Sequence, residues 1–391
     1  MIKVTVDNKD IMVDEGITVL QACELAGKEI PRFCYHDRLS IAGNCRMCLV
    51  EVEKSLKPVA SCAMPVAEGM VIRTDTSLVK KARNGVMEFL LINHPLDCPI
   101  CDQGGECDLQ DQAIGYGYKL SRYSEHKRAV KEKYMGPLVK TIMTRCIHCT
   151  RCIRFATEIA GVEELGAINR GENMEITTYL EKSMTSELSA NVIDLCPVGA
   201  LTSKPYEFKS RPWELSKTET IDVMDSMGAN IRVDTLGEKV MRVLPRVNDE
   251  LNEEWISDKT RYACDGLSMQ RLDQPYRKID GILQPCTWDK AFSEIKNKVE
   301  NIGNDELSAV IGDLVDTDTL FAFSELVNSL QIKHVDCFQN GGNLKINSRS
   351  DYLFNTSITG IEESDFVLLI GTNLRKEAPL INSRITKNWL N

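Results

Sequence analysis

Eleven of the fifteen cysteines fall in tight groups between residues 34 and 196, and this grouping most constrains what the chain can fold into. Cysteines spaced two residues apart suit a shared metal centre better than disulfides, and nothing in the sequence suggests export. We therefore expect metal-binding modules. The other four cysteines, Cys23, Cys264, Cys286 and Cys337, stand apart. Cys23 falls within a predicted helix and is expected to be a small buried core residue.

The sharpest pattern is RCIHCTRCIR followed by DLCPVGAL, which supplies Cys146, Cys149, Cys152 and Cys196. Three thiolates at intervals of three on a curling loop can bind three corners of a cubane, and a later cysteine before proline supplies the fourth. Zinc sites rarely use this triple. We predict a [4Fe-4S] cluster here, with His148 as an exposed spacer between ligands.

A second pattern, HPLDCPICDQGGECDL, crowds four donors together: His94, Cys98, Cys101 and Cys107. Zinc also accepts three thiolates and one imidazole, so the donor set alone leaves zinc and a [4Fe-4S] cluster open. Pro95 restricts His94 to an extended backbone, and the glycine pair at 104 and 105 lets the loop wrap a bulky cubane.

The third pattern comprises Cys34, Cys45, Cys48 and Cys62, and it matches the plant-type [2Fe-2S] arrangement in outline. Its spacing departs from that arrangement, since ten residues rather than four separate the first two cysteines. Zinc is again the alternative. His36, beside Cys34, is expected to be an exposed spacer. The eleven cysteines and His94 provide four donors for each of three clusters, which makes sense as a path for single electrons.

Hydrophobic patterns predict the elements around these ligands. The opening residues IKVTVDNKDIMV read as a hairpin turning at Asn8, so we expect no signal or transit peptide. A helix capped by Thr18 and ended by Gly27 should bury Leu20, Cys23 and Leu25. A second helix over 77–93 should bury Val79, Ala82, Val86, Phe89 and Leu90.

The later part of the chain has a different texture. Residues 218–247 alternate in short runs and predict a small sheet. From Thr287 onward, helices and apolar strands alternate as in α/β domains. We expect helices over 288–302 and 317–330, and strands over 307–311, near His334 and, buried, over 366–370.

Charge and hydropathy exclude some functions. The net charge of −10 argues against nucleic acid as the main partner. No apolar run approaches the roughly 18 residues needed to span a bilayer. One basic stretch, Lys119 to Lys133, is interpreted as a solvated face rather than a docking surface.

Several longer motifs together resemble the large iron–sulfur subunit of respiratory NADH:quinone oxidoreductase, complex I, of the mitochondrial and alphaproteobacterial type. They are GNCRMCLVEVE, HPLDCPICDQGGECDLQD, RCIHCTRCIRF, RPWELSKTETIDVMD and NEEWISDKTR. The resemblance implies an electron-transfer subunit with one [2Fe-2S] and two [4Fe-4S] clusters and no catalytic residue or substrate site of its own. Electrons would enter at the Cys34 set, pass through the Cys146 set and leave from the His94 set.

The same resemblance implies partners and a location. A flavin-bearing, NADH-oxidising subunit would supply electrons, and a ferredoxin-like iron–sulfur subunit of the peripheral arm would receive them on their way to quinone. The chain would then lie on the matrix side of the mitochondrial inner membrane, or on the cytoplasmic face of a bacterial plasma membrane.

The implied fold is a multidomain α+β protein. Its predicted domains are a β-grasp ferredoxin (1–77), a His/Cys₃ cluster module (78–135), a ferredoxin-like domain (136–213), a molybdopterin-enzyme cluster domain without its cluster (214–275) and an incomplete molybdopterin-oxidoreductase-like α/β domain (276–391). The fourth domain has Cys264 as its one cysteine. The fifth domain stops at Asn391, whereas the resemblance implies that the domain is longer in the family. We expect a separate polypeptide or another subunit to complete that last domain.

Two alternative functions remain open on the sequence. The first three modules also occur in the electron-input part of hydrogenases and formate dehydrogenases, although no further cysteine set for a hydrogen-activating cluster is present. A zinc-stabilised interaction scaffold is the alternative from a different class of protein.

Overall fold

The computed structural model divides the chain into two compact units. The first unit comprises Met1–Tyr262 and Ile358–Asn391, and the second comprises Ala263–Ser357. The structure describes residues 1–225, 227–312, 314–337, 347–354 and 356–390. The five predicted domains stay a prediction, because the two units are a coarser division. In this division residues 358–391 belong to the first unit, whereas residues 276–357 belong to the second. None of the described helices has the length and apolar character required to cross a bilayer.

The first unit begins with a five-stranded sheet that has the predicted β-grasp arrangement. Its strands, in the order β2-β1-β5-β3-β4, are β1 (Ile2–Val6), β2 (Lys9–Val13), β3 (Leu49–Val52), β4 (Val59–Ala60) and β5 (Val71–Arg73). Strands β1 and β5 are parallel, and the other pairs are antiparallel. The predicted hairpin turn is confirmed, since Asp7 and Asn8 both have positive φ, as a tight two-residue turn requires.

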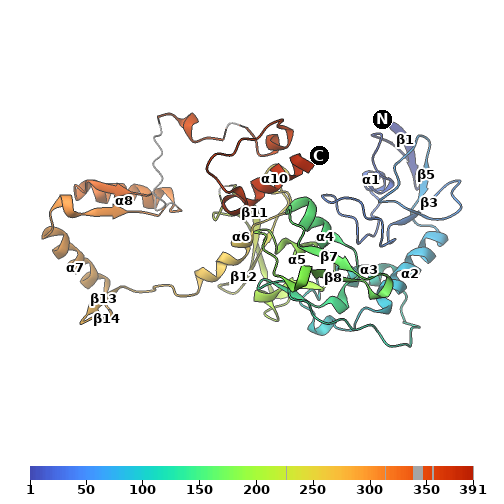
Figure 1. The fold of residues 1–391 in the computed structure, drawn as a ribbon, viewed down its shortest axis with the longest axis horizontal. Helices are drawn as coiled ribbons and strands as arrows, with labels where there is room; N and C mark the ends of the chain where they lie inside the picture. Colours follow the sequence, from blue (N-terminus) through green and yellow to red (C-terminus); the bar gives the residue numbers. More distant parts are fainter. Residues whose placement is uncertain (226, 313, 338–346, 355, 391) are drawn as a thin grey trace. The chain divides into compact units, whose positions relative to one another are not determined.

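Helix α1 (Val19–Leu25) packs beside this sheet (Figure 1). Thr18 caps it as predicted, forming a reciprocal capping box with Gln21. Leu20 and Cys23 are fully buried, which confirms Cys23 as a core residue. The prediction for Leu25 is wrong, because this side chain is 66% exposed. Five residues beyond Leu20, at about 100° per residue, it points away from the buried face.

Helix α2 (Ser77–Ile92) is confirmed, although its buried stripe differs from the predicted one. Val79, Arg83 and Met87 are buried, at four-residue intervals, whereas Phe89 is 78% exposed. Arg83 occupies the middle of the stripe because its Nε donates to the Leu49 carbonyl at 3.1 Å. An arginine that hydrogen-bonds inward is invisible to a hydrophobic pattern. Helix α3 (Asp108–Tyr116) packs against α2.

Two antiparallel strand pairs frame the Cys146 motif. Strand β6 (Val139–Thr141) pairs with β9 (Leu201–Ser203), and β7 (Leu165–Ile168) pairs with β8 (Glu175–Thr178). Because β6 precedes the Cys146 loop and β9 follows Cys196, their pairing brings the two segments together. The short helices α4 (Arg151–Arg154) and α5 (Asn191–Leu195) lie next to these ligands in the chain.

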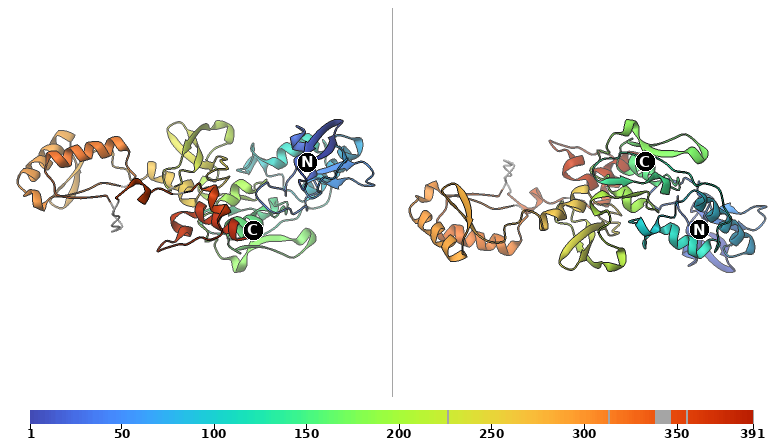
Figure 2. Two further views of the ribbon diagram at one scale, coloured as in Figure 1. Left: turned by 90° about the horizontal axis from the view of Figure 1, so that it is seen from above. Right: turned by 90° about the horizontal axis from the view of Figure 1, so that it is seen from below.

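The small sheet predicted over 218–247 is also confirmed. It consists of β10 (Ser216–Ile221), β11 (Asn230–Leu236) and β12 (Lys239–Pro245), all antiparallel, in the order β10-β11-β12. Figure 2 shows these strands side by side as a sheet of their own. The short helix α6 (Asp258–Tyr262) packs against β12.

The end of the chain returns to the first unit as α9 (Leu374–Glu377) and α10 (Pro379–Leu390), shown in red in Figure 1. The buried strand predicted over 366–370 is wrong, because these residues form no strand and are exposed to different degrees, Phe366 by 78%. An apolar run becomes a buried strand only when neighbouring strands pair with it. The parallel strands of the second unit pair with each other instead.

Arg384 anchors α10. This guanidinium, which is 5% exposed, donates to the carbonyls of Asp249 and Leu251 at 2.7 and 3.0 Å and pairs with Glu253 and Glu362. In an Arg384→Met variant we expect the free energy that holds α10 in place to fall by about 3 kcal/mol, because Glu253 loses one partner of a buried ion pair. Hydrogen exchange over residues 379–390 measures this loss. Trp389→Leu on the same helix is the control, since that side chain is 82% exposed, and equal exchange in both variants would contradict the anchoring role.

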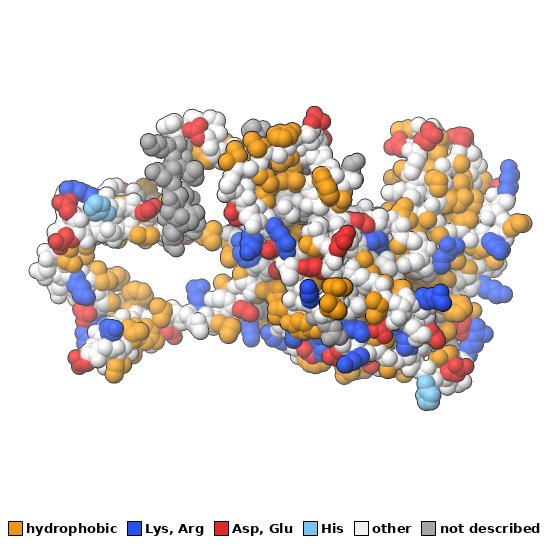
Figure 3. Space-filling model, viewed as in Figure 1, with side chains coloured by type: hydrophobic (Ala, Val, Ile, Leu, Met, Phe, Trp, Pro, Cys, Tyr) orange, Lys and Arg blue, Asp and Glu red, His pale blue; other side chains and the backbone are white. Residues whose placement is uncertain are grey.

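The second unit has mixed helix and strand content. It contains β13 (Tyr276–Ile279) paired with β14 (Ile282–Pro285), helices α7 (Trp288–Glu300) and α8 (Thr317–Ser329), and the parallel strands β15 (Ser308–Val310) and β16 (His334–Asp336). Thr287 and Asp316 cap the two helices. Trp288 and Phe292 are exposed and stack on each other, and hydrophobic side chains show around α7 in Figure 3. Together the two units confirm the mixed α+β class.

Candidate iron–sulfur centres

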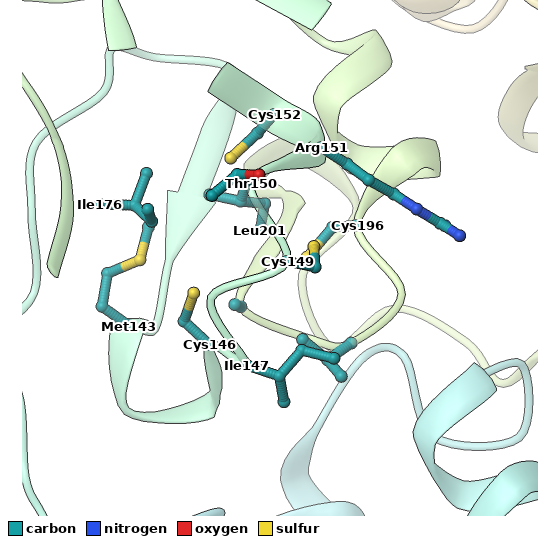
Figure 4. A pocket seen from close by; sticks show the side chains of 12 residues that line it. Met143, Cys146, Ile147, Cys149, Thr150, Arg151, Cys152, Ile176, Cys196 and Leu201 are labelled. Atoms are coloured by element: carbon teal, nitrogen blue, oxygen red, sulfur yellow. The ribbon is translucent and has the colours of Figure 1, made fainter. Parts of the chain in front are cut away.

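The four cysteines of the sharpest motif line one cavity. Figure 4 shows the sulfur atoms of Cys146 and Cys152 directed into it, with Cys149 and Cys196 at its other side. Apolar side chains such as Met143, Ile176 and Leu201 complete the lining, while the guanidinium of Arg151 points away. The structure therefore brings these four predicted donors together in apolar surroundings.

Burial controls the thiol chemistry of this set. It raises the pKa of Cys146 to about 11 and that of Cys196 to about 12, with neighbouring thiols adding to the shift. Protonated thiols are poor ligands, so these residues suit a centre whose positive charge holds them as thiolates. The amide of His148 donates to the Cys146 sulfur at 3.4 Å, in the manner of hydrogen bonds that tune iron–sulfur centres.

The two histidines expected to be exposed spacers are instead half-buried. The His148 ring contacts Arg128 at 3.3 Å, and burial lowers its pKa. This ring does not line the cavity of the Cys146 set. His36 pairs with Glu254 at 3.0 Å and stacks on Trp255. The partners of both rings come from distant parts of the chain, which explains why local sequence did not predict this burial.

The second donor set lines another cavity, together with Gly104, Arg145 and Gly199. Its predicted members are His94, Cys98, Cys101 and Cys107. Cys101 and Cys107 are buried, and Cys98 is exposed. Burial raises the pKa of Cys107 to about 11.

His94 fits the role of a metal ligand. Burial, with help from the charges of Arg145 and Lys127, lowers its pKa to about 4, so the ring is neutral at physiological pH. Its Nδ1 is buried and has no hydrogen-bond partner in the structure. A neutral imidazole with a buried, unsatisfied nitrogen suits coordination to a metal, which would satisfy that atom.

Lys127, from the predicted basic stretch, lies close to this set. Its Nζ donates to the carbonyls of Leu91 and Ile92 at 2.8 Å, at the C-terminal end of α2 just before His94. Lys133 pairs with Glu175 in the same way within the chain. Part of the charge of this stretch is thus used to hold the molecule together.

The third donor set gathers on and beside the β-grasp sheet. Cys34, Cys48 and Cys62 are buried, and Cys45 is half-buried. The Cys34 amide donates to the Cys45 sulfur at 3.4 Å. Hydrogen bonds from the sulfur atoms of Cys45 and Cys62 lower the pKa of the Cys34 thiol, and the contact with Cys34 raises that of Cys62. These sulfur atoms therefore lie within hydrogen-bonding reach of each other.

The fifteen cysteines all lie in described parts of the chain, and no disulfide joins any two of them. Within the described residues, no three His, Cys, Asp or Glu side chains converge on a position for a single metal ion.

Two arginines that the sequence analysis did not single out connect the Cys34 set with the Cys146 set. Arg154 Nη2 donates to the carbonyls of two predicted ligands, Cys34 at 2.6 Å and Cys149 at 3.1 Å. Arg151 Nη2 donates to the Tyr35 carbonyl at 2.7 Å. Arg151 lies between Cys149 and Cys152, and Arg154 follows Cys152 by two residues. Their position within the cysteine motif was the one sequence feature that could have marked them as functional.

A second junction joins the Cys146 and His94 sets. Arg145, almost fully buried, pairs with Asp97 at 3.0 Å, and each residue directly precedes a predicted ligand, Cys146 and Cys98. Gly199 lies so close to Cys101 that a Cβ added to it would be 2.1 Å from the sulfur atom. The Cys107 sulfur lies 3.7 Å from the Pro197 carbonyl. Residues next to the Cys146 set thus join it to both of the others.

Five family descriptions match successive segments of the chain. They are a 2Fe-2S iron-sulfur cluster binding domain (1–77), an NADH-ubiquinone oxidoreductase-G iron-sulfur binding region (83–122), a ferredoxin-like domain of NADH-quinone oxidoreductase subunit 3 (136–202), an NDSU1/NuoG-like 4Fe-4S domain (215–265) and a molybdopterin oxidoreductase (271–391). The fold and these matches define an iron–sulfur protein with 2Fe-2S and 4Fe-4S binding domains.

The chain belongs to the family of the large iron–sulfur subunit of NADH–quinone oxidoreductase, complex I. It is 60% identical to an NADH-quinone oxidoreductase subunit of Rickettsia bellii over 98% of this chain and 56% of that protein. It is 57% identical to the mitochondrial NADH-ubiquinone oxidoreductase 78 kDa subunit of Neurospora crassa over 100% of this chain and 53% of that protein. The chain therefore spans little more than half the length of these relatives.

One solved structure also resembles part of the chain. It is an NAD+-reducing [NiFe]-hydrogenase, 28% identical, with a TM-score of 0.49 over 54% of this chain and 90% of that one.

Proposed function

We propose that this chain relays single electrons through three iron–sulfur clusters. Cys34, Cys45, Cys48 and Cys62 would hold a [2Fe-2S] cluster. Two [4Fe-4S] clusters would be held by Cys146, Cys149, Cys152 and Cys196 and by His94, Cys98, Cys101 and Cys107. Clusters of these types, when bound, exchange one electron at a time. The residues of the chain hold and insulate them, and none is assigned an acid–base or nucleophilic role.

The junctions that join the Cys146 set to both other sets carry this proposal. Arg154 bonds the backbone of Cys34 to that of Cys149, and Gly199 lets the segment after Cys196 touch Cys101. A chain of three adjoining sites with the Cys146 set in the middle supports relay through that set, and the resemblance to the complex I family supplies the direction, with entry at the Cys34 set and exit from the His94 set. Three independent zinc sites would have no need of such contacts.

We further propose that the chain works as a subunit of NADH:quinone oxidoreductase. A flavin-bearing, NADH-oxidising subunit would supply its electrons, and a ferredoxin-like iron–sulfur subunit of the peripheral arm would take them toward quinone. NADH, flavin and quinone would bind those neighbours. The names of the relatives, one bacterial and one mitochondrial, support this assignment. The chain would then lie on the matrix side of the mitochondrial inner membrane, or on the cytoplasmic face of a bacterial membrane.

Metal analysis of the native complex, isolated without oxygen, tests the proposal. We expect iron and acid-labile sulfide in similar amounts, broad brown absorbance, and EPR signals of one binuclear and two tetranuclear centres that ligand substitutions in this chain remove one at a time. Zinc in place of iron at these residues, with no labile sulfide, would overturn it in favour of a scaffold.

A further inference from the structure

The sheet β10–β12 has no evident task of its own. Residues 215–265 match a 4Fe-4S domain, yet Cys264 is the one cysteine among them. Three of the four cysteine ligands that a cluster needs are therefore missing from this segment. Several contacts of the sheet, and of the residues that lead into it, nevertheless reach the loop from Cys98 to Cys107.

The residues leading into the sheet bind the backbone of this loop. Arg211 donates through Nη1 to the carbonyl of Cys101 at 2.6 Å, and through Nη2 to that of Pro99. The amide of Phe208 donates to the Asp102 carboxylate at 2.9 Å. Carbonyls in the loop, which has little regular structure, thus find partners in a segment more than 100 residues away.

The ring of Trp213 covers the tip of the loop. A Cβ added to Gly105 would lie 2.5 Å from the Trp213 ring, and Gly105 has a φ of +95°. Both the conformation and the space therefore demand glycine there. The glycine pair serves to let the tryptophan approach as well as to let the loop curl.

The sheet itself grips the loop by an ion pair. Arg242 on β12 binds both carboxylate oxygens of Glu106, at 2.6 and 2.9 Å, and Glu106 directly precedes Cys107. Arg242 Nε also donates at 2.9 Å to the carboxylate of Asp234, its cross-strand partner on β11. The guanidinium carbon lies 5.1 Å from the centre of the Tyr206 ring. Asp234 is fully buried, so this two-point arrangement is rigid.

We propose that the sheet β10–β12 and residues 206–213 form a clamp that positions the Cys98–Cys107 loop and thereby retains and tunes the His94-ligated cluster. The inference rests on the proposed function, since it concerns one of its three centres. On this proposal, the role of residues 215–265 is to support the Cys98–Cys107 loop rather than to bind a cluster of their own. Partners that orient metal ligands in this way typically change metal affinity by about 10- to 100-fold when they are removed.

The test uses the native complex with Arg242→Gln in this chain. We expect the His94-set centre to lose iron to a chelator at least about tenfold faster. Its EPR signal should broaden or its midpoint potential should shift, while the other two centres stay unchanged. Arg246→Gln is the matched control, because Arg246 follows the same strand but pairs with the exposed Glu219 at 3.5 Å.

Arg211→Gln is the second variant, should the complex with Arg242→Gln not assemble. It removes donors to two loop carbonyls without touching the sheet, and the same selective loss is expected. Unchanged iron retention, line shape and midpoint potential in Arg211→Gln and in any assembled Arg242→Gln complex would overturn the clamp. Failure of the proposed function would show separately, as missing labile sulfide in the unsubstituted complex.

Discussion

Replacement of Cys149 by alanine is expected to remove one tetranuclear EPR signal and to abolish NADH-to-quinone turnover. Cys149 lines the cavity of the middle donor set, where three other cysteines surround the same space. Its carbonyl also accepts from Arg154, which binds Cys34 as well. Loss of one thiolate from a four-ligand site in the centre of a linear relay interrupts the path for every electron. EPR of the reduced complex and steady-state turnover measure the two effects.

Cys23→Ala is the control for this experiment. Cys23 is also buried, and burial raises the pKa of its thiol to about 12, but it packs in the core of the β-grasp domain and belongs to no proposed donor set. Its replacement should leave all signals and turnover intact. Turnover that survives in the Cys149 variant would remove that centre from the electron path.

Gly199→Ala is expected to eliminate the centre of the His94 set while leaving that of the Cys34 set in place. The added methyl group would lie 2.1 Å from the Cys101 sulfur, far inside contact distance, so either the sulfur or the turn after Cys196 must move. The Arg145 guanidinium, which reaches the Gly199 carbonyl at 3.4 Å, would be displaced with it. Iron content and EPR of the purified complex measure the loss.

Gly166→Ala supplies the matched control, because nothing lies within 4 Å of a Cβ at that position. It should retain every signal. A Gly199→Ala complex with a native signal from the His94 set would show that the Cys101 sulfur does not need this space.

Cysteine spacing predicted which donors come together, because ligands to one centre are close in sequence or follow a recognisable turn. The pairing of β6 with β9, which was not predicted, brings Cys196 to the Cys146 loop, where the motif places it. The β-grasp hairpin and α1 were likewise predictable from local alternation and capping. Identification of the donors as cluster ligands remains a prediction that the experiments above address.

Features that depend on residues far away in the chain could not be predicted from the sequence. Arg154, Arg145 and Gly199 look like ordinary residues of a motif until the chain folds and places them against another donor set. The strand expected over 366–370 failed for a related reason, since apolar composition cannot reveal whether a neighbouring strand is within reach. Phe89 shows the opposite error, a hydrophobic residue at a plausible position that stays exposed.

The anchoring of α10 bears on how the protein is made. Arg384 and its buried partner Glu253 are 131 residues apart, so at typical rates of synthesis roughly 7 to 26 s separate their emergence from the ribosome. All twelve proposed donors precede Glu253. Every proposed donor therefore leaves the ribosome before α10 can form the ion pairs that hold it against the first unit.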